Sequence, residues 1–348
     1  MFHNATDQGP GLLDLSGWGA HRCDMTTALT HNKPGLAIAL KLGAVFMFMV
    51  MAAMIKAVAD VVPPGQAVFY RSFFALPIIA LWLGQRGELR QGLIPSNLSG
   101  HVWRGLFGTT AMGLTFAGLG LLPLPEVTAI GYATPMFTVI LGALLLGERV
   151  RMVRITAVAL GLVGVMVVIA PRLSIGDGGY EQATLIGAVM VLIAALLRAL
   201  VQIHVRQLVK TDHTAAIVFY FSVTATVLAL LSAPIGWVFD HPSFVWVWPD
   251  RTTLVLLISA GLMGGVAQIM VTSSYRFAGV SVLAPFDYTS MIFASIIGYV
   301  IFAEQPTAPM LIGAALVIAG GVLIIWRERQ IGVDRSKSKP NVTPPGAT

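Results

Sequence analysis

An acidic residue lies inside a long apolar stretch near the end of this chain. Asp287 and its neighbour Tyr288 follow Pro285, and a proline at such a point locally breaks a helix and frees a backbone carbonyl. Because ionisable groups within a membrane are costly, each one is a candidate for function. Two interpretations of Asp287 stay open: a site for a substrate amine or a proton, or a structural partner of Arg198 or His204.

Three basic residues lie in the first two apolar stretches, and two of them, Lys56 and Arg71, are candidates for function. We expect Lys56 and Arg71 in the outer portions of these stretches, and Asp60 follows Lys56 at a spacing that puts both on one helix face. These cations either recognise a substrate carboxylate or phosphate, or form an ion pair that fixes the outer helix ends while snorkelling toward the surface.

Neutral polar residues inside apolar stretches form a second group of candidates. Gln268 follows the pattern Gly261-x-x-x-Gly265, which is typical of closely packed membrane helices, and its amide suits a neutral polar substrate. Thr109 is a milder candidate, since threonine in a membrane helix usually bonds its own backbone.

A third group lies together in one stretch. Arg198 and Gln202 are four residues apart and therefore face the same way. His204 follows near the inner interface, where it either couples protons to transport or simply lies at the headgroup boundary.

The composition indicates what must position these residues. The chain has 348 residues, of which 56% are hydrophobic and only 11% charged, whereas soluble domains are near a quarter charged. A membrane-spanning helix needs roughly 20 apolar residues. The sequence predicts an all-α integral membrane protein with ten such segments, at about 35–58, 66–84, 104–121, 126–147, 153–171, 184–205, 214–238, 252–275, 280–303 and 309–326.

The regions outside these segments are polar. Residues 1–34 predict a disordered tail, in which Met25 is an alternative start to Met1. Residues 172–183 predict a linker, and 327–348 a basic tail. Lys and Arg concentrate in alternate loops, with only Arg172 and Arg251 on the opposite side, so the positive-inside rule places both termini in the cytoplasm. The same placement argues that the net charge of +6 is a topology signal and not a nucleic-acid interface.

An internal repeat organises the segments. Shifting the chain by 156 positions superimposes Tyr132 on Tyr288 and Glu148 on Glu304. We therefore expect two repeats, at 35–171 and 184–326, inverted relative to each other, with both tyrosines facing a shared axis. Inverted repeats allow one fold to open to either side of the membrane.

The two repeat-related glutamates end corresponding segments. A carboxylate there is well placed to accept the unpaired N–H groups at the start of the next helix. We interpret Glu148 and Glu304 as structural or gate residues, not as substrate ligands.

The repeats resemble the EamA repeat of the drug/metabolite transporter superfamily. The resemblance covers about residues 35–328, and the second copy departs from the pattern at Met291, where the first has Pro135, and at Ala303, where the first has Gly147. It implies a ten-helix inner-membrane carrier with a central cavity lined mainly by helices 1, 3, 4, 6, 8 and 9. The motifs are Pro135, Leu146-Gly-Glu-Arg149, Gly161-x-x-Gly164 and Phe69-Tyr-Arg-Ser72, with Ala303-Glu304, Gly313, Gly320-Gly321 and Trp326-Arg-Glu-Arg329 in the second copy.

Together these features predict a secondary transporter that works by alternating access. We expect a neutral or zwitterionic substrate, either a vitamin such as riboflavin that is taken up or an amino acid or other metabolite that is exported. A polytopic enzyme acting on lipid is the rival class. The partners are the substrate and membrane lipid, in a monomer or homodimer, without cofactor or metal. The predicted cavity residues are Thr109, Tyr132, Gln268, Asp287 and Tyr288, with Lys56 and Arg71 nearer the outer mouth.

Overall fold

The computed structural model describes residues 33–87, 94–95, 97–146, 152–172, 179–208, 212, 214–239, 245–278 and 280–337. Within these residues the chain forms helices and no strand. The elements are α1 (Pro34–Ala57), α2 (Pro64–Phe73), α3 (Ala75–Gln85), α5 (Leu98–Leu121), α6 (Leu124–Gly131), α7 (Ala133–Leu146), α8 (Met152–Ile169), η2 (Ala170–Arg172), α9 (Gly179–Leu208), α10 (Thr214–Phe239), α11 (Arg251–Phe277), α12 (Val280–Leu283), η3 (Ala284–Tyr288), α13 (Thr289–Phe302) and α14 (Ala308–Lys337).

The apolar segments are the helices of a multi-pass membrane protein. Seven helical stretches in the described part of the chain are long and apolar enough to cross a membrane. Two shorter apolar stretches lie in α8 and α14, at Ile155–Ile169 and Ala308–Ile324. The helix α5 has the length to span but carries His101 and Arg104 within it. A count of ten spans therefore stays a prediction.

Three boundaries differ from those predicted. The helix α5 begins at Leu98, so Arg104 lies inside the helix and not in the preceding loop. The helix α9 begins at Gly179, inside the predicted linker, and α14 continues to Lys337, through half of the predicted C-terminal tail. In each case the helix extends past its apolar part into polar residues, which hydropathy does not detect. The predicted N-terminal tail, including Met25, lies almost entirely outside the described residues.

Three of the apolar segments are interrupted helices. The breaks fall at Phe74, at Tyr132 and at the 3₁₀ turn Ala284–Tyr288. The last one confirms the break expected from Pro285. The break at Tyr132 lies three residues before Pro135, which lacks the N–H that would bond to Gly131. The Thr134 hydroxyl instead donates to the Gly131 carbonyl at 2.8 Å.

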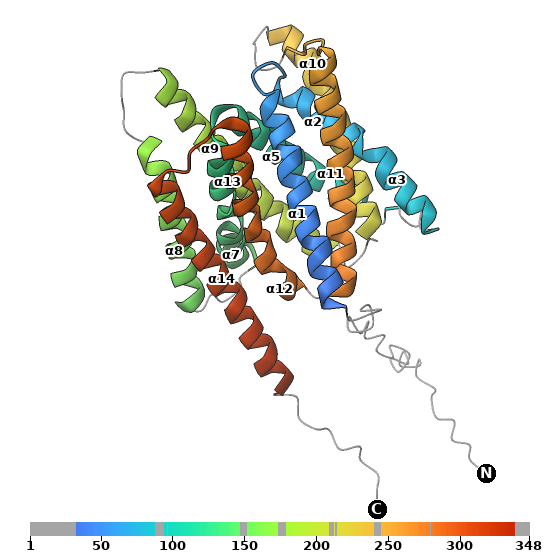
Figure 1. Cartoon of the computed structure of the whole chain (residues 1–348). Helices are drawn as coiled ribbons and strands as arrows, with labels where there is room; N and C mark the ends of the chain where they lie inside the picture. Colours follow the sequence, from blue (N-terminus) through green and yellow to red (C-terminus); the bar gives the residue numbers. More distant parts are fainter. Residues whose placement is uncertain are drawn as a thin grey trace, which may run out of the picture.

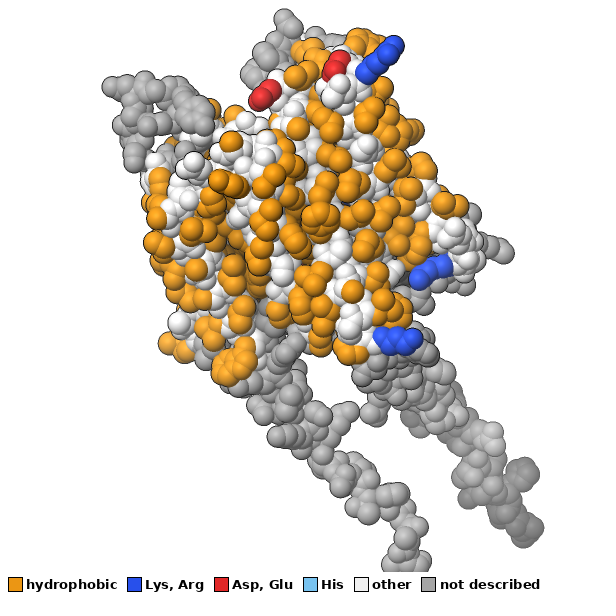
Figure 2. Space-filling view, in the orientation of Figure 1, with side chains coloured by type: hydrophobic (Ala, Val, Ile, Leu, Met, Phe, Trp, Pro, Cys, Tyr) orange, Lys and Arg blue, Asp and Glu red, His pale blue; other side chains and the backbone are white. Residues whose placement is uncertain are grey.

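The helices pack in pairs that are distant in sequence. The helix α1 lies along α11, α5 along α9, and α8 along α14 (Figure 1). The pairs join the first half of the chain to the second, and α1 begins on the same side of the bundle on which α14 ends. One face of the bundle is covered by hydrophobic side chains, with charged side chains confined to its two margins (Figure 2). This is the surface that a helical bundle presents to lipid.

The contact between α8 and α14 is unusually close. A Cβ atom added to Gly164 would lie 2.6 Å from the Gly313 carbonyl oxygen, and one added to Gly320 would lie 2.6 Å from the Ala157 carbonyl oxygen. Small residues allow such approach of two backbones. The two contacts are related by the same shift of 156 positions that superimposes Tyr132 on Tyr288, because it carries Ala157 to Gly313 and Gly164 to Gly320.

Candidate functional site: a central cavity with three arginines

A cavity of about 400 Å³ lies between the two halves of the chain. Side chains from α1, α2, α5, α6, α9, α10 and α13 line it, and most of them are apolar. Its polar lining residues are three arginines and four hydroxyl groups: Arg71, Arg104, Arg198, Thr115, Thr128, Tyr132 and Ser290. None of the described lining residues is acidic.

The three arginines come from three different helices. Arg71 lies on α2 and is only 7% exposed, Arg104 lies on α5, and Arg198 lies on α9. The Arg104 Nη1 donates to the Ile217 carbonyl at 3.0 Å, and the Arg198 Nε donates to the Ala194 carbonyl at 3.3 Å. Within the described residues, the Nε atoms of Arg71 and Arg104 and the Nη2 of Arg198 are buried without a hydrogen-bond partner. The three arginines that line the cavity therefore each keep a nitrogen without a partner.

Aromatic and glycine residues make room for these guanidinium groups. The Cζ atoms of Arg104 and Arg71 lie 4.6 and 6.0 Å from the centre of the Phe221 ring, within the range of cation–π attraction. The Arg198 guanidinium lies against Gly131, where a Cβ atom would be 3.5 Å from Nη2. Gly131 directly precedes the break at Tyr132, so the Arg198 guanidinium lies beside the point where the helix is interrupted.

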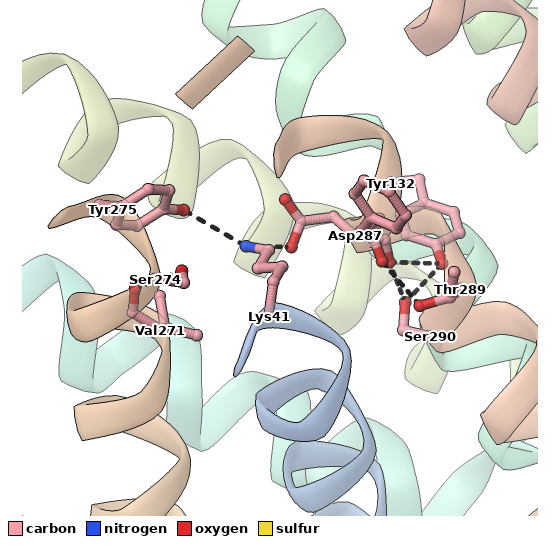
Figure 3. A network of polar contacts seen from close by, with 9 residues as sticks. Lys41, Tyr132, Val271, Ser274, Tyr275, Asp287, Thr289 and Ser290 are labelled. Carbon is pink, nitrogen blue, oxygen red and sulfur yellow. Dashed lines mark hydrogen bonds and ion pairs between the residues drawn. The ribbon is translucent and has the colours of Figure 1, made fainter. Parts of the chain in front are cut away.

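The two repeat-related tyrosines meet beside the cavity. The rings of Tyr132 and Tyr288 lie edge to face with centroids 5.1 Å apart, an arrangement that aromatic pairs favour. The Tyr132 hydroxyl hydrogen-bonds Ser290 Oγ and donates to the Tyr288 carbonyl at 3.2 Å (Figure 3). Tyr132 lines the cavity, whereas the Tyr288 hydroxyl points at α14, where it occupies the space beside Gly321.

Asp287 pairs with a lysine that sequence reasoning did not single out. The Lys41 Nζ lies 2.7 Å from Asp287 Oδ1 and donates to the Tyr275 hydroxyl at 3.3 Å (Figure 3). The Lys41 side chain is 4% exposed and that of Asp287 52%. The expected structural partners of Asp287 were therefore wrong: Arg198 lines the cavity, and His204 bonds the Gly100 carbonyl at 3.0 Å.

Lys56 lies at the other end of α1 and has a dense set of partners. Its Nζ lies 3.0 Å from Glu304 Oε1 and donates to the carbonyls of Leu119 and Leu122 at 3.0 and 2.6 Å. The predicted pairing with Asp60 is wrong, because α1 ends at Ala57 and Asp60 lies beyond it. An ion pair fixing helix ends is nevertheless what Lys56 forms.

Glu304 also accepts a hydrogen bond from the N-terminus of a helix, as its position at the end of an apolar segment predicted. Its Oε2 accepts from the Leu124 N–H at 2.9 Å, at the start of α6, whereas the expected acceptor role was toward the following helix. Ala303 makes this possible by ending α13 in a left-handed conformation, with φ of 54°. Glu148, the repeat-related residue, lies outside the described residues.

The remaining candidates lie away from the central cavity. Thr109 lines a second, larger cavity of about 720 Å³ between α2, α5 and α10, and its hydroxyl has no partner in the described part of the chain. The Gln268 side chain lines neither cavity. The structure thus groups Arg71 and Tyr132 with Arg104 and Arg198. Arg104 was missed because it was counted as a loop residue. The signal that would have found it is the N-cap at Asn97, whose side chain accepts from the Gly100 N–H and starts α5 ahead of Arg104.

Comparison with known proteins assigns the family. The EamA-like transporter family matches this chain twice, over residues 35–170 and 185–326. The chain belongs to the EamA-like transporter family. Both matches fall on the repeats read from the sequence, and the family is one of transporters and not of enzymes, which removes the rival lipid enzyme.

Curated relatives of this EamA-family chain carry different transport names. It is 28% identical over 296 residues to the pseudopaline exporter CntI of Pseudomonas aeruginosa, covering 84% of this chain and 94% of that one. It is 26% identical over 265 residues to the S-adenosylmethionine uptake transporter of Rickettsia prowazekii, covering 76% and 84%. One solved structure shares the fold, with a TM-score of 0.57 and 19% identity, over 85% of this chain and 98% of the other.

Proposed function

We propose that this protein is a secondary transporter that moves a small organic metabolite across the inner membrane by alternating access. The observation that carries the proposal is the central cavity enclosed by helices of both family matches, with an ion pair near each end of α1. We further propose ten spans in two inverted repeats, both termini in the cytoplasm, and Lys56 at the outer end of α1.

The contacts between the halves support an inverted arrangement. Helices α8 and α14 meet through Gly164 with Gly313 and through Ala157 with Gly320, so the order along one helix runs opposite to the order along the other. Tyr132 meets its own repeat mate Tyr288. Such self-paired contacts are expected close to a two-fold axis in the membrane plane.

The two ion pairs of α1 are suited to act as gates. Lys56 and Glu304 join the ends of α1 and α13 to the start of α6, and they bond the backbones of the cavity residues Leu119 and Leu124. Lys41 and Asp287 join the other end of α1 to η3. In this proposal one pair separates while the other holds, so that the cavity opens to each side in turn.

The direction of transport and the class of substrate need separate arguments. The two relatives cited differ in direction, since one is named an exporter and the other an uptake transporter. Neither name mentions riboflavin, and a neutral vitamin would leave three largely buried guanidinium groups without a counter-charge. We therefore retain metabolite export and metabolite uptake and no longer propose a vitamin.

Measuring metabolites in intact bacteria tests the proposal. Untargeted mass spectrometry would compare cells and medium for strains with this protein, with an empty vector, and with the double variant Lys56→Cys and Glu304→Cys in a Cys23→Ser background, before and after it is locked by a short bismaleimide. We expect at least one metabolite to redistribute saturably with the unlocked protein alone. No redistribution, or equal redistribution by the locked variant, would contradict a carrier that works by alternating access.

A further inference from the structure

We infer that the substrate of the central cavity is a small organic anion with at least two acidic groups, bound jointly by Arg71, Arg104 and Arg198. This inference rests on the proposed transport function and names its substrate class. It goes against the neutral or zwitterionic solute expected from the sequence, because that expectation counted only one of the three arginines near the site.

Charge is the first argument. Three guanidinium groups line a cavity of about 400 Å³, and the described lining contains no carboxylate. No ion pair in the described part of the chain involves any of the three arginines. Arginine stays protonated in proteins, so the lining of the cavity concentrates positive charge. The ligand that binds there most favourably is therefore an anion with more than one negative charge.

Unused hydrogen-bond donors are the second argument. Each of the three arginines has a buried nitrogen without a partner among the described residues. Buried donors left unpaired are destabilising, whereas guanidinium forks bind carboxylates and phosphates with two parallel hydrogen bonds. Arg104 and Arg198 are held in place by one backbone carbonyl each, so these two forks are positioned before any ligand arrives.

The different surroundings of the arginines are the third argument. Arg71 and Arg104 both lie over the Phe221 ring, while Arg198 lies against Gly131 on the interrupted helix. Between them the lining is largely apolar, with Met49, Met112 and Phe116. We assign one acidic group to Arg71 and Arg104 and another to Arg198, with the carbon skeleton against the apolar lining.

The same charge bears on direction. A bacterial membrane potential is negative inside, and moving one charge across it changes the free energy by about 2.3 kcal/mol per 100 mV. A multivalent anion is driven outward by that potential without another ion, whereas its uptake requires co-transported cations. Among the two directions the cavity therefore favours export.

Thermal unfolding of the purified protein in detergent tests the inference. The probes are sodium citrate, sodium succinate and fructose 1,6-bisphosphate, with succinamide as the uncharged match to succinate and putrescine as a dication, all at equal ionic strength. We expect a saturable rise in Tm with the anions, larger for citrate than for succinate, and none with succinamide or putrescine. Comparing citrate with fructose 1,6-bisphosphate distinguishes a preference for carboxylates from a preference for phosphates.

Matched variants separate specific binding from general salt effects, which stabilise proteins without saturating. We expect Arg71→Gln, Arg104→Gln and Arg198→Gln each to weaken anion binding by about 10- to 100-fold, as for loss of one charge-assisted hydrogen bond. Arg251→Gln, at the exposed start of α11, should leave it unchanged. Arg→Lys variants keep the charge but lose the two parallel hydrogen bonds of the guanidinium group, so we expect an intermediate loss of anion binding. They replace a Gln variant that does not fold.

Three results would overturn the inference: equal shifts from succinate and succinamide, anion shifts that persist in all three Gln variants, or no saturable shift from any of the anions. Its failure is distinct from failure of the transport proposal. If cells redistribute a neutral or cationic metabolite, the protein is a transporter and the anion inference is wrong. If no metabolite redistributes, the transport proposal itself fails.

Discussion

Lys56 Nζ and Glu304 Oε1 lie 3.0 Å apart and join the last turn of α1 to the residue after the cap of α13. The two side chains are each 14% exposed, and both make further bonds, to the carbonyls of Leu119 and Leu122 and to the N–H of Leu124. One ion pair therefore holds four chain segments together at one end of the cavity. Because the partners come from both family matches, the pair couples the two halves directly.

Removing one member of this pair should destabilise the protein. Lys56→Gln leaves the Glu304 carboxylate largely buried without its cation, and breaking a buried pair typically lowers stability by about 3–5 kcal/mol. We expect a fall in Tm of several degrees, measured by a thermal-unfolding assay in detergent. Exchanging the charges, with Lys56→Glu and Glu304→Lys together, should recover part of the loss. A single variant as stable as the wild type would show that the pair does not hold the two halves.

The pair at the other end of α1 has a different expected phenotype. Asp287→Asn removes the charged partner of the Lys41 ammonium, whose side chain is 4% exposed and which also donates to the Tyr275 hydroxyl. We expect transport to fall at least about tenfold while the protein still reaches the membrane, as measured by flux and by membrane-fraction abundance. The double variant Lys41→Met with Asp287→Asn removes the orphaned charge and should keep the abundance unchanged without restoring flux. Unchanged kinetics in Asp287→Asn would exclude a role for this residue in the transport cycle.

The α8–α14 contact should tolerate no added side chain. In Gly164→Ala the new Cβ atom would lie 2.6 Å from the backbone oxygen of Gly313, and overpacking of this kind typically lowers stability by about 1–3 kcal/mol. Gly113→Ala is the control, since no heavy atom lies within 4 Å of its added Cβ, and alanine favours the helix by up to about 1 kcal/mol. Unfolding curves should therefore shift in opposite directions for the two variants, and similar shifts would count against the close contact.

We expect the cavity arginines to lower the stability of the ligand-free protein while they bind the anion. Arg198→Met removes a buried guanidinium that has no acidic partner in the described residues, and replacing buried charge by an apolar side chain is often stabilising by about 1–4 kcal/mol. We expect the ligand-free Tm to rise, while the anion-dependent rise in Tm disappears. An arginine retained only for structure would show the reverse, a lower Tm in the absence of ligand, and that result would contradict a ligand-binding role.

Much of the architecture was readable from local sequence. Apolar length predicted the helical segments, Pro285 predicted the break that became η3, and the shift of 156 positions paired Tyr132 with Tyr288, whose rings are in contact. These features depend on covalent geometry and on the need of a backbone in lipid to bond within its own helix. The sequence therefore determined the class of protein, the repeat, and which residues were costly enough to suggest function.

The partners of those residues were decided only by tertiary structure. Lys56 was four residues from Asp60 but pairs with Glu304, and Asp287 pairs with Lys41, which is far away in the chain. Which charges meet depends on how α1 lies against the second half, and no spacing along the chain records that. The same holds for the cavity: Arg71, Arg104 and Arg198 lie on three helices, and only the packing of those helices brings three like charges together around one cavity.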